Sequence, residues 1–271
     1  EGVPDFGWMD SATHDVARGL RPGTLVSYET TLPIGTTRDR FGPMLAEGSG
    51  LNSGEVNLVF SPERVFTGRV FSDLRRYPKL VGGIDAESGR AGKRFYESVL
   101  DFDVRTELPR ANGVWDLGSA EAAEMAKLAE TTYRDVNIGL ANQFARFAGG
   151  RGINIYSVIE ACNSQPFSHI HQPGIAVGGH CIPIYPQMYL WNDPEATVVS
   201  AARSANAHMP LYAVDQLEAT HGALEGQTVV ILGAAYRGGV KETAFSGVFP
   251  LAAELRARRA HPVIQDPLYT D

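Results

Sequence analysis

The chain has 271 residues, of which 44% are hydrophobic and 20% charged, values that are ordinary for a globular protein with ample core. Its formal net charge of -7 argues against a general nucleic-acid-binding surface, and no apolar run approaches the roughly 18 residues of a membrane span. Two cysteines, Cys162 and Cys181, cannot build a disulfide scaffold, so we expect a reducing cytoplasm. Because Glu1 is not a natural start, we expect the native N-terminus to lie upstream.

The first half of the chain alternates predicted helices and strands, an order that indicates a parallel α/β sheet. The predicted segments are a helix over 12–20, a strand over 24–28, a helix over 37–47, and strands over 55–60 and 80–83. Ligands of such sheets bind beyond the carboxyl ends of the strands. Thr31 and Glu63 each follow a predicted strand, so we expect both at that edge.

A long helix is predicted over 120–148, with Ser119 as its N-cap and Gly149-Gly150 at its end. It exceeds the usual length of a globular helix, which favours a place at the centre of an assembly or a dimer. The later segments are predicted as helices over 154–162 and 196–220, a strand over 228–233, a helix over 250–259 and a strand over 261–265. The last three form a βαβ unit.

The segment Gly178-Gly179-His180-Cys181-Ile182-Pro183 places a cysteine behind two glycines. Thiolates are strong nucleophiles, and glycines let backbone approach closely, so Cys181 is a candidate nucleophile. The alternative is a tight loop that holds a small apolar residue. The histidines around this segment do not have the spacing of a metal site, and we predict no metal.

Three further features have both a chemical and a structural interpretation. Lys127 and Thr131 are i,i+4 neighbours on the long helix, where they form either a functional pair or part of a solvated face. Glu63 is either a general base or a helix cap. The backbone of 173–179 suits a phosphate or sugar, but is equally typical of a connector.

The glycines after the strand at 228–233 offer a weak phosphate-binding signal, with Arg237 as a charge donor. No G-x-G-x-x-G motif occurs in the chain, so the sequence contains no complete dinucleotide fingerprint.

Taken together, four stretches resemble the nucleotide-sugar dehydrogenase family, whose members oxidise C6 of UDP-glucose, UDP-N-acetylhexosamines or GDP-mannose to a carboxylate. They are ETTLPIGTT (29–37), SPERVFTGR (61–69), AEMAKLAETTYRDVNIGLAN (123–142) and PGIAVGGHCIPIYP (173–186). A fifth, weaker stretch is LGAAYRGGVKETAFSG (232–247). Their shared order and spacing are more specific than any one motif.

The resemblance implies an α/β fold with part of an N-terminal NAD-binding Rossmann domain, a long central dimerisation helix, and the start of a C-terminal Rossmann-like domain. The expected boundaries are 1–117, 118–222 with the cysteine loop, and 223–271. Both ends then fall inside domains. We expect parts to be missing on each side, because the strand over 24–28 needs neighbours to cover its edges.

The resemblance also implies a mechanism with two hydride transfers to two NAD⁺. Cys181 attacks the aldehyde to form a thiohemiacetal, the second transfer gives a thioester, and water hydrolyses it. Lys127 is expected to stabilise oxyanions or assist proton transfer, and Glu63 to position or activate the water. Thr131 and Tyr185 complete the expected catalytic set.

The remaining expectations concern ligands and partners. Thr31 and Glu29 are expected to contact NAD. The nucleotide-sugar substrate is expected to bind Arg64, Gly178, Gly179, His180 and Arg237. The family resemblance further implies a homodimer through the central helix, in a cytoplasmic, bacterial enzyme that serves polysaccharide or glycoconjugate synthesis without nucleic-acid or membrane partners.

The chain departs from the family pattern at five positions. Asparagine is usual at Thr131, aspartate at Tyr185, lysine at Arg237, arginine at Ala244 and glycine at Ala176. A tyrosine does not replace a carboxylate as base at neutral pH without a large pKa shift.

Glu63, Lys127 and Cys181 persist, so we expect a divergent dehydrogenase that acts on a UDP-N-acetylhexosamine or on a UDP- or TDP-hexose. The G-G-H-C-I-P form resembles the UDP-N-acetylhexosamine branch. Two alternatives are a non-redox acid–base enzyme that uses Glu63, Lys127 and Tyr185, and a silent nucleotide-sugar-binding relative without the NAD phosphate site.

Overall fold

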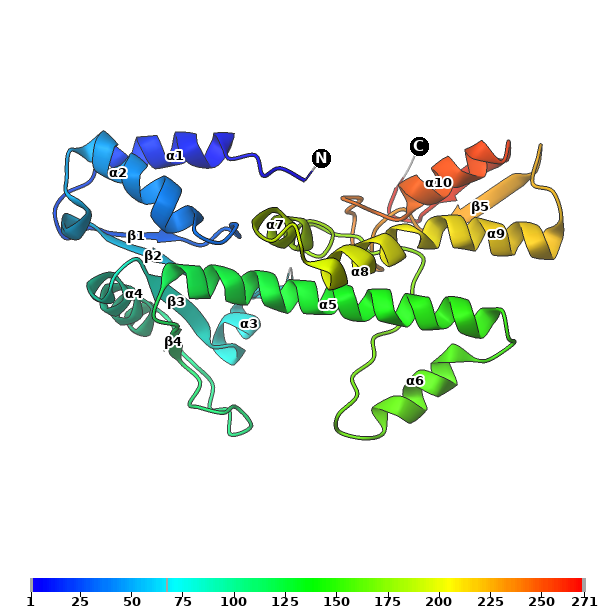
Figure 1. Ribbon diagram of the computed structural model, residues 1–271, viewed down its shortest axis with the longest axis horizontal. Coiled ribbons are helices and arrows are strands. Elements are labelled where there is room, and N and C mark those ends of the chain that lie inside the picture. The colour runs from blue at the N-terminus through cyan, green and yellow to red at the C-terminus, as the bar shows by residue number, and fades with distance from the viewer. Residues whose placement is uncertain (1, 67, 270–271) are drawn as a thin grey trace. The chain divides into compact units, whose positions relative to one another are not determined.

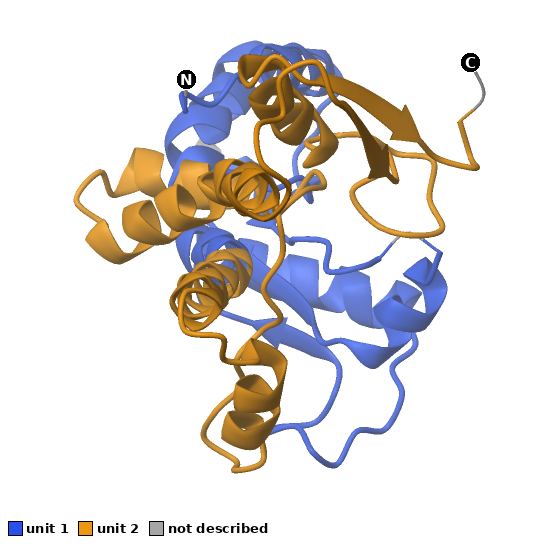
Figure 2. Cartoon of the chain, turned by 90° about the vertical axis from the view of Figure 1, so that its right-hand side faces the viewer, with its two compact units in different colours: residues 1–129 blue, residues 130–271 orange. Residues whose placement is uncertain are grey.

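The computed structural model describes residues 2–66 and 68–269, so Thr67 of the 61–69 stretch lies outside the described residues. The chain divides into two compact units, residues 1–129 and 130–271, which we call unit 1 and unit 2 (Figure 2). The division falls inside the longest helix, α5 (Ala120–Gly149), which confirms the long helix predicted from the sequence. The three domain boundaries expected from the family stay a prediction.

Unit 1 is built on a four-stranded sheet with the strand order β1-β2-β3-β4 (Figure 1). The strands are β1 (Leu25–Tyr28), β2 (Asn57–Phe60), β3 (Lys79–Gly83) and β4 (Val114–Asp116). Its helices are α1 (Gly7–Ala17), α2 (Gly42–Ser49), α3 (Val70–Arg76) and α4 (Ala86–Val99), together with the first part of α5. A π-helical turn, η1 (Thr37–Phe41), precedes α2, and a 3-10 turn, η2 (Ser53–Glu55), precedes β2.

The apolar run of β2 is buried on both faces of this sheet. Leu58 and Phe60 belong to a core cluster with residues of α1, α2 and the start of α5. Val59, between them, joins the opposite cluster with Val81 and with Tyr96 of α4. Successive side chains of a strand point to opposite faces, so a strand covered on both sides must be apolar at every position.

The expectation of a parallel sheet was wrong for one pair of strands. β1 and β2 run parallel, as do β3 and β4, but β2 and β3 are antiparallel. Parallel neighbours need a crossover along one face of the sheet. The chain here returns at the end where β2 stops, and Ser61 Oγ donates a 2.7 Å hydrogen bond to Leu80 O at the start of β3. The carboxyl end of β2 therefore lies beside the amino end of β3.

Two helix boundaries also differ from the predictions. The helix expected over 12–20 is α1, which begins at Gly7 and ends at Ala17, before the Arg21-Pro22-Gly23 turn. The helix expected over 37–47 begins with η1 and continues as α2, which has Pro43 in its first turn. Proline lacks the N–H that would bond the preceding turn, so a regular α-helix cannot run through it unchanged.

Unit 2 contains the rest of α5, four further helices and a βαβ unit. These are α6 (Ile155–Asn163), α7 (Tyr185–Asn192), α8 (Thr197–Ala207), α9 (Met209–His221), β5 (Thr228–Leu232), α10 (Val248–Ala257) and β6 (His261–Gln265). β5 and β6 pair in parallel, and Val229 and Ile231 of β5 pack with α9 and α10. The predicted βαβ unit is confirmed. The helix predicted over 196–220 is two helices, because Pro210 lies in the first turn of α9.

Among the described residues, no helix combines the length and the apolarity that crossing a membrane requires.

Candidate active site

Glu124 of α5 fixes the loop that follows β1. It is fully buried, and its carboxylate accepts hydrogen bonds from Gly35 N at 2.6 Å, Thr37 N at 2.9 Å and Thr37 Oγ1 at 2.7 Å. Burial raises the pKa of Glu124, while the hydrogen bonds from Thr37 and Gly35 oppose that rise. The loop that carries Thr31 is therefore anchored to the helix that carries Lys127.

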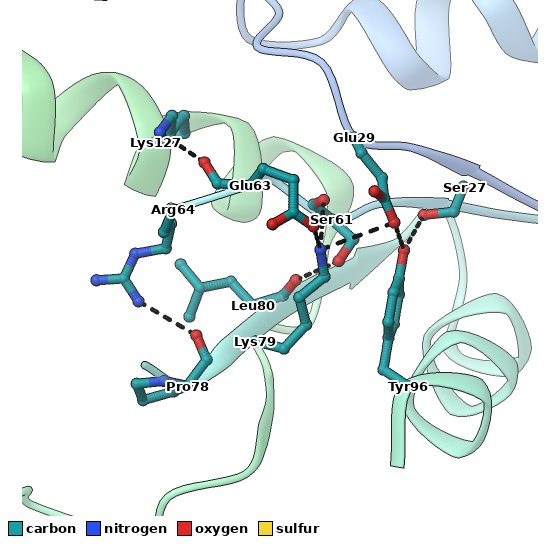
Figure 3. A network of polar contacts seen from close by, with 10 residues as sticks. All are labelled: Ser27, Glu29, Ser61, Glu63, Arg64, Pro78, Lys79, Leu80, Tyr96 and Lys127. Carbon is teal, nitrogen blue, oxygen red and sulfur yellow. Dashed lines mark hydrogen bonds and ion pairs between the residues drawn. The ribbon is translucent and has the colours of Figure 1, made fainter. Parts of the chain in front are cut away.

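Glu63 and Lys127 are brought together in unit 1, as Figure 3 shows. Lys127 is buried, and its Nζ donates a 2.7 Å hydrogen bond to the backbone oxygen of Glu63. The carboxylate of Glu63 points away from that contact, and its side chain is 36% exposed. Arg64, next in the chain, donates to Pro78 O at 3.3 Å. The lysine thus fixes the backbone of the glutamate and leaves its carboxylate available for other contacts.

A buried lysine that the sequence prediction missed occupies the same place. Lys79, the first residue of β3, forms an ion pair with the Glu63 carboxylate and lies 3.7 Å from the Glu29 carboxylate (Figure 3). Tyr96 donates a hydrogen bond to Glu29, and burial is the main cause that raises the pKa of Tyr96. Glu29, Glu63 and Lys79 therefore form one charged cluster at the carboxyl ends of β1 and β2.

The antiparallel pairing explains why the sequence did not reveal Lys79. In a parallel sheet, the first residue of β3 would lie at the edge opposite to Glu63. Because β3 runs against β2, Lys79 starts where β2 ends. A Pro-Lys pair before an apolar run was the sequence signal for this residue.

Thr131 lies one turn after Lys127 on α5, in unit 2, and is buried. One turn further, Asp135 is fully buried and accepts a 2.8 Å hydrogen bond from Arg203 Nη1. Asn206 of α8 also donates to the Asp135 carboxylate, at 2.8 Å. Burial raises the pKa of Asp135, with the Arg203 charge opposing it. This ion pair joins α5 to α8 within unit 2.

The cysteine loop packs against the segment 234–247 of unit 2. Gly179 N donates a 3.1 Å hydrogen bond to Ala244 O, and Gly179 has a φ of +91°. A Cβ at Gly178 would lie 2.6 Å from Tyr236 Cβ and 2.8 Å from Phe245 O, so only glycine fits there. The loop ends in a tight turn, in which Cys181 O accepts from Tyr185 N at 2.9 Å. Cys181 itself is exposed at the start of this turn.

The other predicted substrate residues of unit 2 lie at the same junction. His180 Nε2 is 3.3 Å from Glu242 Oε2, and the pKa of Glu242 is lowered by the backbone N–H of Ala244 and by His180. Arg237 is exposed and donates to Tyr236 Oη at 3.4 Å. A cavity of about 450 Å³ lies among the loop, this segment and the helices α8, α9 and α10, and its lining includes Ala176, Val177, Pro183, Arg203, Phe245 and Ser246.

The predicted residues therefore form two groups. Glu29, Thr31, Glu63, Arg64 and Lys127 belong to unit 1. The glycines, His180, Cys181, Tyr185 and Arg237 belong to unit 2, as does Thr131. In the part of the chain that the structure describes, no three His, Cys, Asp or Glu side chains are placed to hold a metal ion.

Comparisons with known proteins identify the family. Residues 1–100 match the NAD binding domain of the UDP-glucose/GDP-mannose dehydrogenase family, and residues 121–208 match the central domain of the same family. The chain belongs to the UDP-glucose/GDP-mannose dehydrogenase family. The resemblance drawn from the four sequence stretches is thereby confirmed, and so is the Rossmann-type α/β fold class.

Among curated relatives of this dehydrogenase family, the UDP-N-acetyl-D-mannosamine dehydrogenase of Pyrococcus horikoshii is 36% identical over 246 residues, which are 89% of this chain and 56% of the relative. The enzyme of the same name from Escherichia coli K12 is 32% identical over 225 residues, 80% of this chain and 51% of the relative. The chain thus spans about half the length of the curated relatives it matches.

Solved structures agree with this family assignment. The UDP-D-ManNAc dehydrogenase structure from Pyrococcus horikoshii matches with a TM-score of 0.88 and 34% identity, over 98% of this chain and 62% of the other. An NDP-N-acetyl-D-galactosaminuronic acid dehydrogenase from Methanosarcina mazei Go1 matches with a TM-score of 0.85 and 30% identity, over 97% and 58%.

Proposed function

We propose that the protein carrying this chain is an NAD-dependent dehydrogenase that oxidises C6 of a UDP-N-acetylhexosamine to the uronic acid. The observation that carries the proposal is the exposed Cys181, held in a glycine loop of the family's form, together with the Glu63–Lys127 pair. Support for the sugar class comes from relatives that are named as UDP-N-acetyl-D-mannosamine dehydrogenases. Its two free cysteines support a cytoplasmic location.

The end of β1 offers groups that suit the nicotinamide part of NAD. The Thr31 hydroxyl and the Glu29 carboxylate can donate to and accept from a carboxamide, and Glu29 keeps 42% of its side chain exposed. These residues would hold NAD⁺, which would supply the hydride acceptor for each of the two oxidations at C6. The sequence of this chain contains no G-x-G-x-x-G motif.

Cys181 would carry the sugar between the two oxidations. Its thiolate adds to the C6 aldehyde, and the alkoxide of the thiohemiacetal takes up a proton. After the second oxidation, the thioester is hydrolysed and Cys181 leaves as a thiolate. Lys127 is the cation suited to stabilise the oxyanions, and Glu63 is the carboxylate suited to accept a proton from the water.

Tyr185 and Ala244 stand where the family usually has charged side chains. Nearby, His180 of the cysteine loop and Glu242 of the segment 234–247 place a histidine and a carboxylate 3.3 Å apart. This pair is the group we propose for proton transfer in place of the missing aspartate.

The second copy needed for a homodimer would bind an apolar stripe on α5. Tyr133, Leu140, Phe144 and Phe147 recur at spacings of seven, four and three residues, so they share one helix face, and all are exposed. Such a stripe on a long helix suits association with an identical helix.

The experiment that tests the function is NADH formation with a panel of nucleotide sugars, read by absorbance. We expect turnover with a UDP-N-acetylhexosamine and weaker turnover with UDP-glucose or GDP-mannose. Conversion of a nucleotide sugar without NADH would favour the non-redox alternative, and binding without any conversion would favour the silent relative. Either result would refute the dehydrogenase proposal.

A further inference from the structure

Lys79 is a buried charged residue to which the proposed chemistry assigns no role. Its side chain is only 5% exposed, and its Nζ lies 4.7 Å from the centre of the Tyr96 ring. Nζ also donates to Ser61 O at 3.4 Å. Burying an ammonium group is costly unless it is paired. We therefore expect the buried Lys79 to have a partner that its positive charge stabilises.

The partners of Lys79 are the two carboxylates at the candidate site. Its Nζ contacts Glu63 Oε1 and lies 3.7 Å from Glu29 Oε1 (Figure 3). Both glutamates keep more than a third of their side chains exposed, at 36% and 42%. The lysine is therefore the buried partner of two carboxylates whose side chains remain partly exposed.

Tyr96 and Ser61 hold this lysine in place. Tyr96 Oη bonds to both Glu29 and Ser27, and the aromatic ring covers the ammonium group. Ser61 is fully buried and ties the end of β2 to β3 through Leu80 O. Lys79 thus has little freedom to follow a moving carboxylate, which makes it a fixed point for Glu63.

We propose that Lys79 is a positioning residue, which orients the Glu63 carboxylate for thioester hydrolysis; this role rests on the proposed function. Lys127 holds the backbone of Glu63 and Lys79 holds Oε1, so that Oε2 is left to meet the water. Two anchors on one residue give the fixed geometry that general-base catalysis requires.

The step that depends on this geometry needs no further reactant. The water oxygen bonds to the thioester carbon while one water proton passes to Glu63. The carbon–sulfur bond then breaks, and its electron pair stays on Cys181 Sγ. The carboxylic acid so formed releases its own proton to solvent, and Glu63 returns its proton likewise.

The test compares Lys79→Met, which keeps the length and removes the charge, with Lys79→Arg, which keeps the charge. Lys93→Met, at an exposed lysine of α4, is the matched control. We expect Lys79→Met to lower kcat about 10- to 100-fold with little change in KM. Intact-mass spectrometry during turnover should show the sugar acyl group accumulating on Cys181. Lys79→Arg should restore most of kcat, and Lys93→Met should match the wild type.

A Lys79→Met enzyme with wild-type kcat would overturn the inference while leaving the dehydrogenase intact. So would a slow Lys79→Met enzyme without the acyl adduct, because its defect would precede hydrolysis. A wild-type protein that forms no NADH would instead refute the proposed function, and with it the catalytic use of Glu63.

A thermal-unfolding cycle tests the pair without activity. Lys79→Met, Glu63→Gln and the double variant should give Tm shifts that are clearly non-additive, because each single change leaves one charged or polar partner behind. Additive shifts would show that Lys79 does not hold Glu63, and would overturn the inference whatever the enzyme's activity.

Discussion

At the scale of single residues, Gly178 is the point where the cysteine loop depends most on the absence of a side chain. A Cβ at this position would lie 2.6 Å from Tyr236 Cβ and 2.8 Å from Phe245 O, which is too close for any side chain. The next residue, Gly179, bonds to Ala244 in a left-handed conformation. Together these contacts define where Cys181 emerges from the loop.

We therefore expect Gly178→Ala to destabilise unit 2 by about 1–3 kcal/mol, because the added methyl group forces the loop away from Tyr236. The displaced loop should also change the rate at which Cys181 reacts with a thiol reagent. Gly174→Ala is the matched control, since the nearest atom to its Cβ would be Ala176 O at 3.8 Å. Equal stability and thiol reactivity in the two variants would contradict the packing described for the loop.

Single residues also show how much of the candidate site can be predicted from the sequence. Cys181, Lys127 and Glu63 were found because each belongs to a stretch with a recognisable pattern, and the structure places Lys127 against Glu63. Their catalytic roles stay predictions. Lys79 was missed, because its partners are distant in sequence and become neighbours only through an antiparallel strand pair.

At the scale of elements, the buried side chain of Glu124 ties the loop after β1 to α5. Its buried carboxylate accepts three hydrogen bonds from Gly35 and Thr37. Burial raises the pKa of Glu124 above its ordinary value of 4.5. The folded protein therefore binds this proton more tightly than the unfolded chain does, and the group favours folding at low pH.

The stabilisation that protonated Glu124 gives is fully present below the ordinary pKa of the carboxyl group. It is lost as the pH rises through the raised pKa that Glu124 has in the folded protein. We expect the wild type to lose stability relative to Glu124→Gln, which does not titrate, as the pH increases from about 4.5. Urea unfolding at a series of pH values measures the difference. If the stability of the wild type instead increased relative to Glu124→Gln with rising pH, the effect of burial on this carboxyl group would be contradicted.

The elements that sequence patterns predicted well are those with strong local signals. The apolar runs of β1, β2 and β5 and the capped helices α5 and α6 lie close to their predicted bounds. The amphipathic α4 was not predicted, since its apolar residues are few and its glycines pack on the sheet: a Cβ at Gly92 would lie 2.9 Å from Val81. The direction of β3 had no local signal at all, because strand pairing is decided by tertiary contacts.

At the scale of the whole molecule, the apolar stripe on α5 predicts a homodimer. Phe147 is 64% exposed, and a large apolar side chain in such a stripe is costly to leave in water. We expect the wild type to sediment as a dimer and Phe147→Asp to shift it towards the monomer. Phe71→Asp, at an exposed phenylalanine of α3, is the control and should leave the dimer unchanged. A monomeric wild type would contradict the proposed association.

NADH counted per molecule of uronic acid is the most direct test of the proposal that Cys181 carries the sugar between two oxidations. We expect two NADH for each acid formed by the wild type. We expect Cys181→Ser to stop after the aldehyde stage, with no acid released. Normal acid production by Cys181→Ser, with two NADH per acid, would contradict the covalent mechanism.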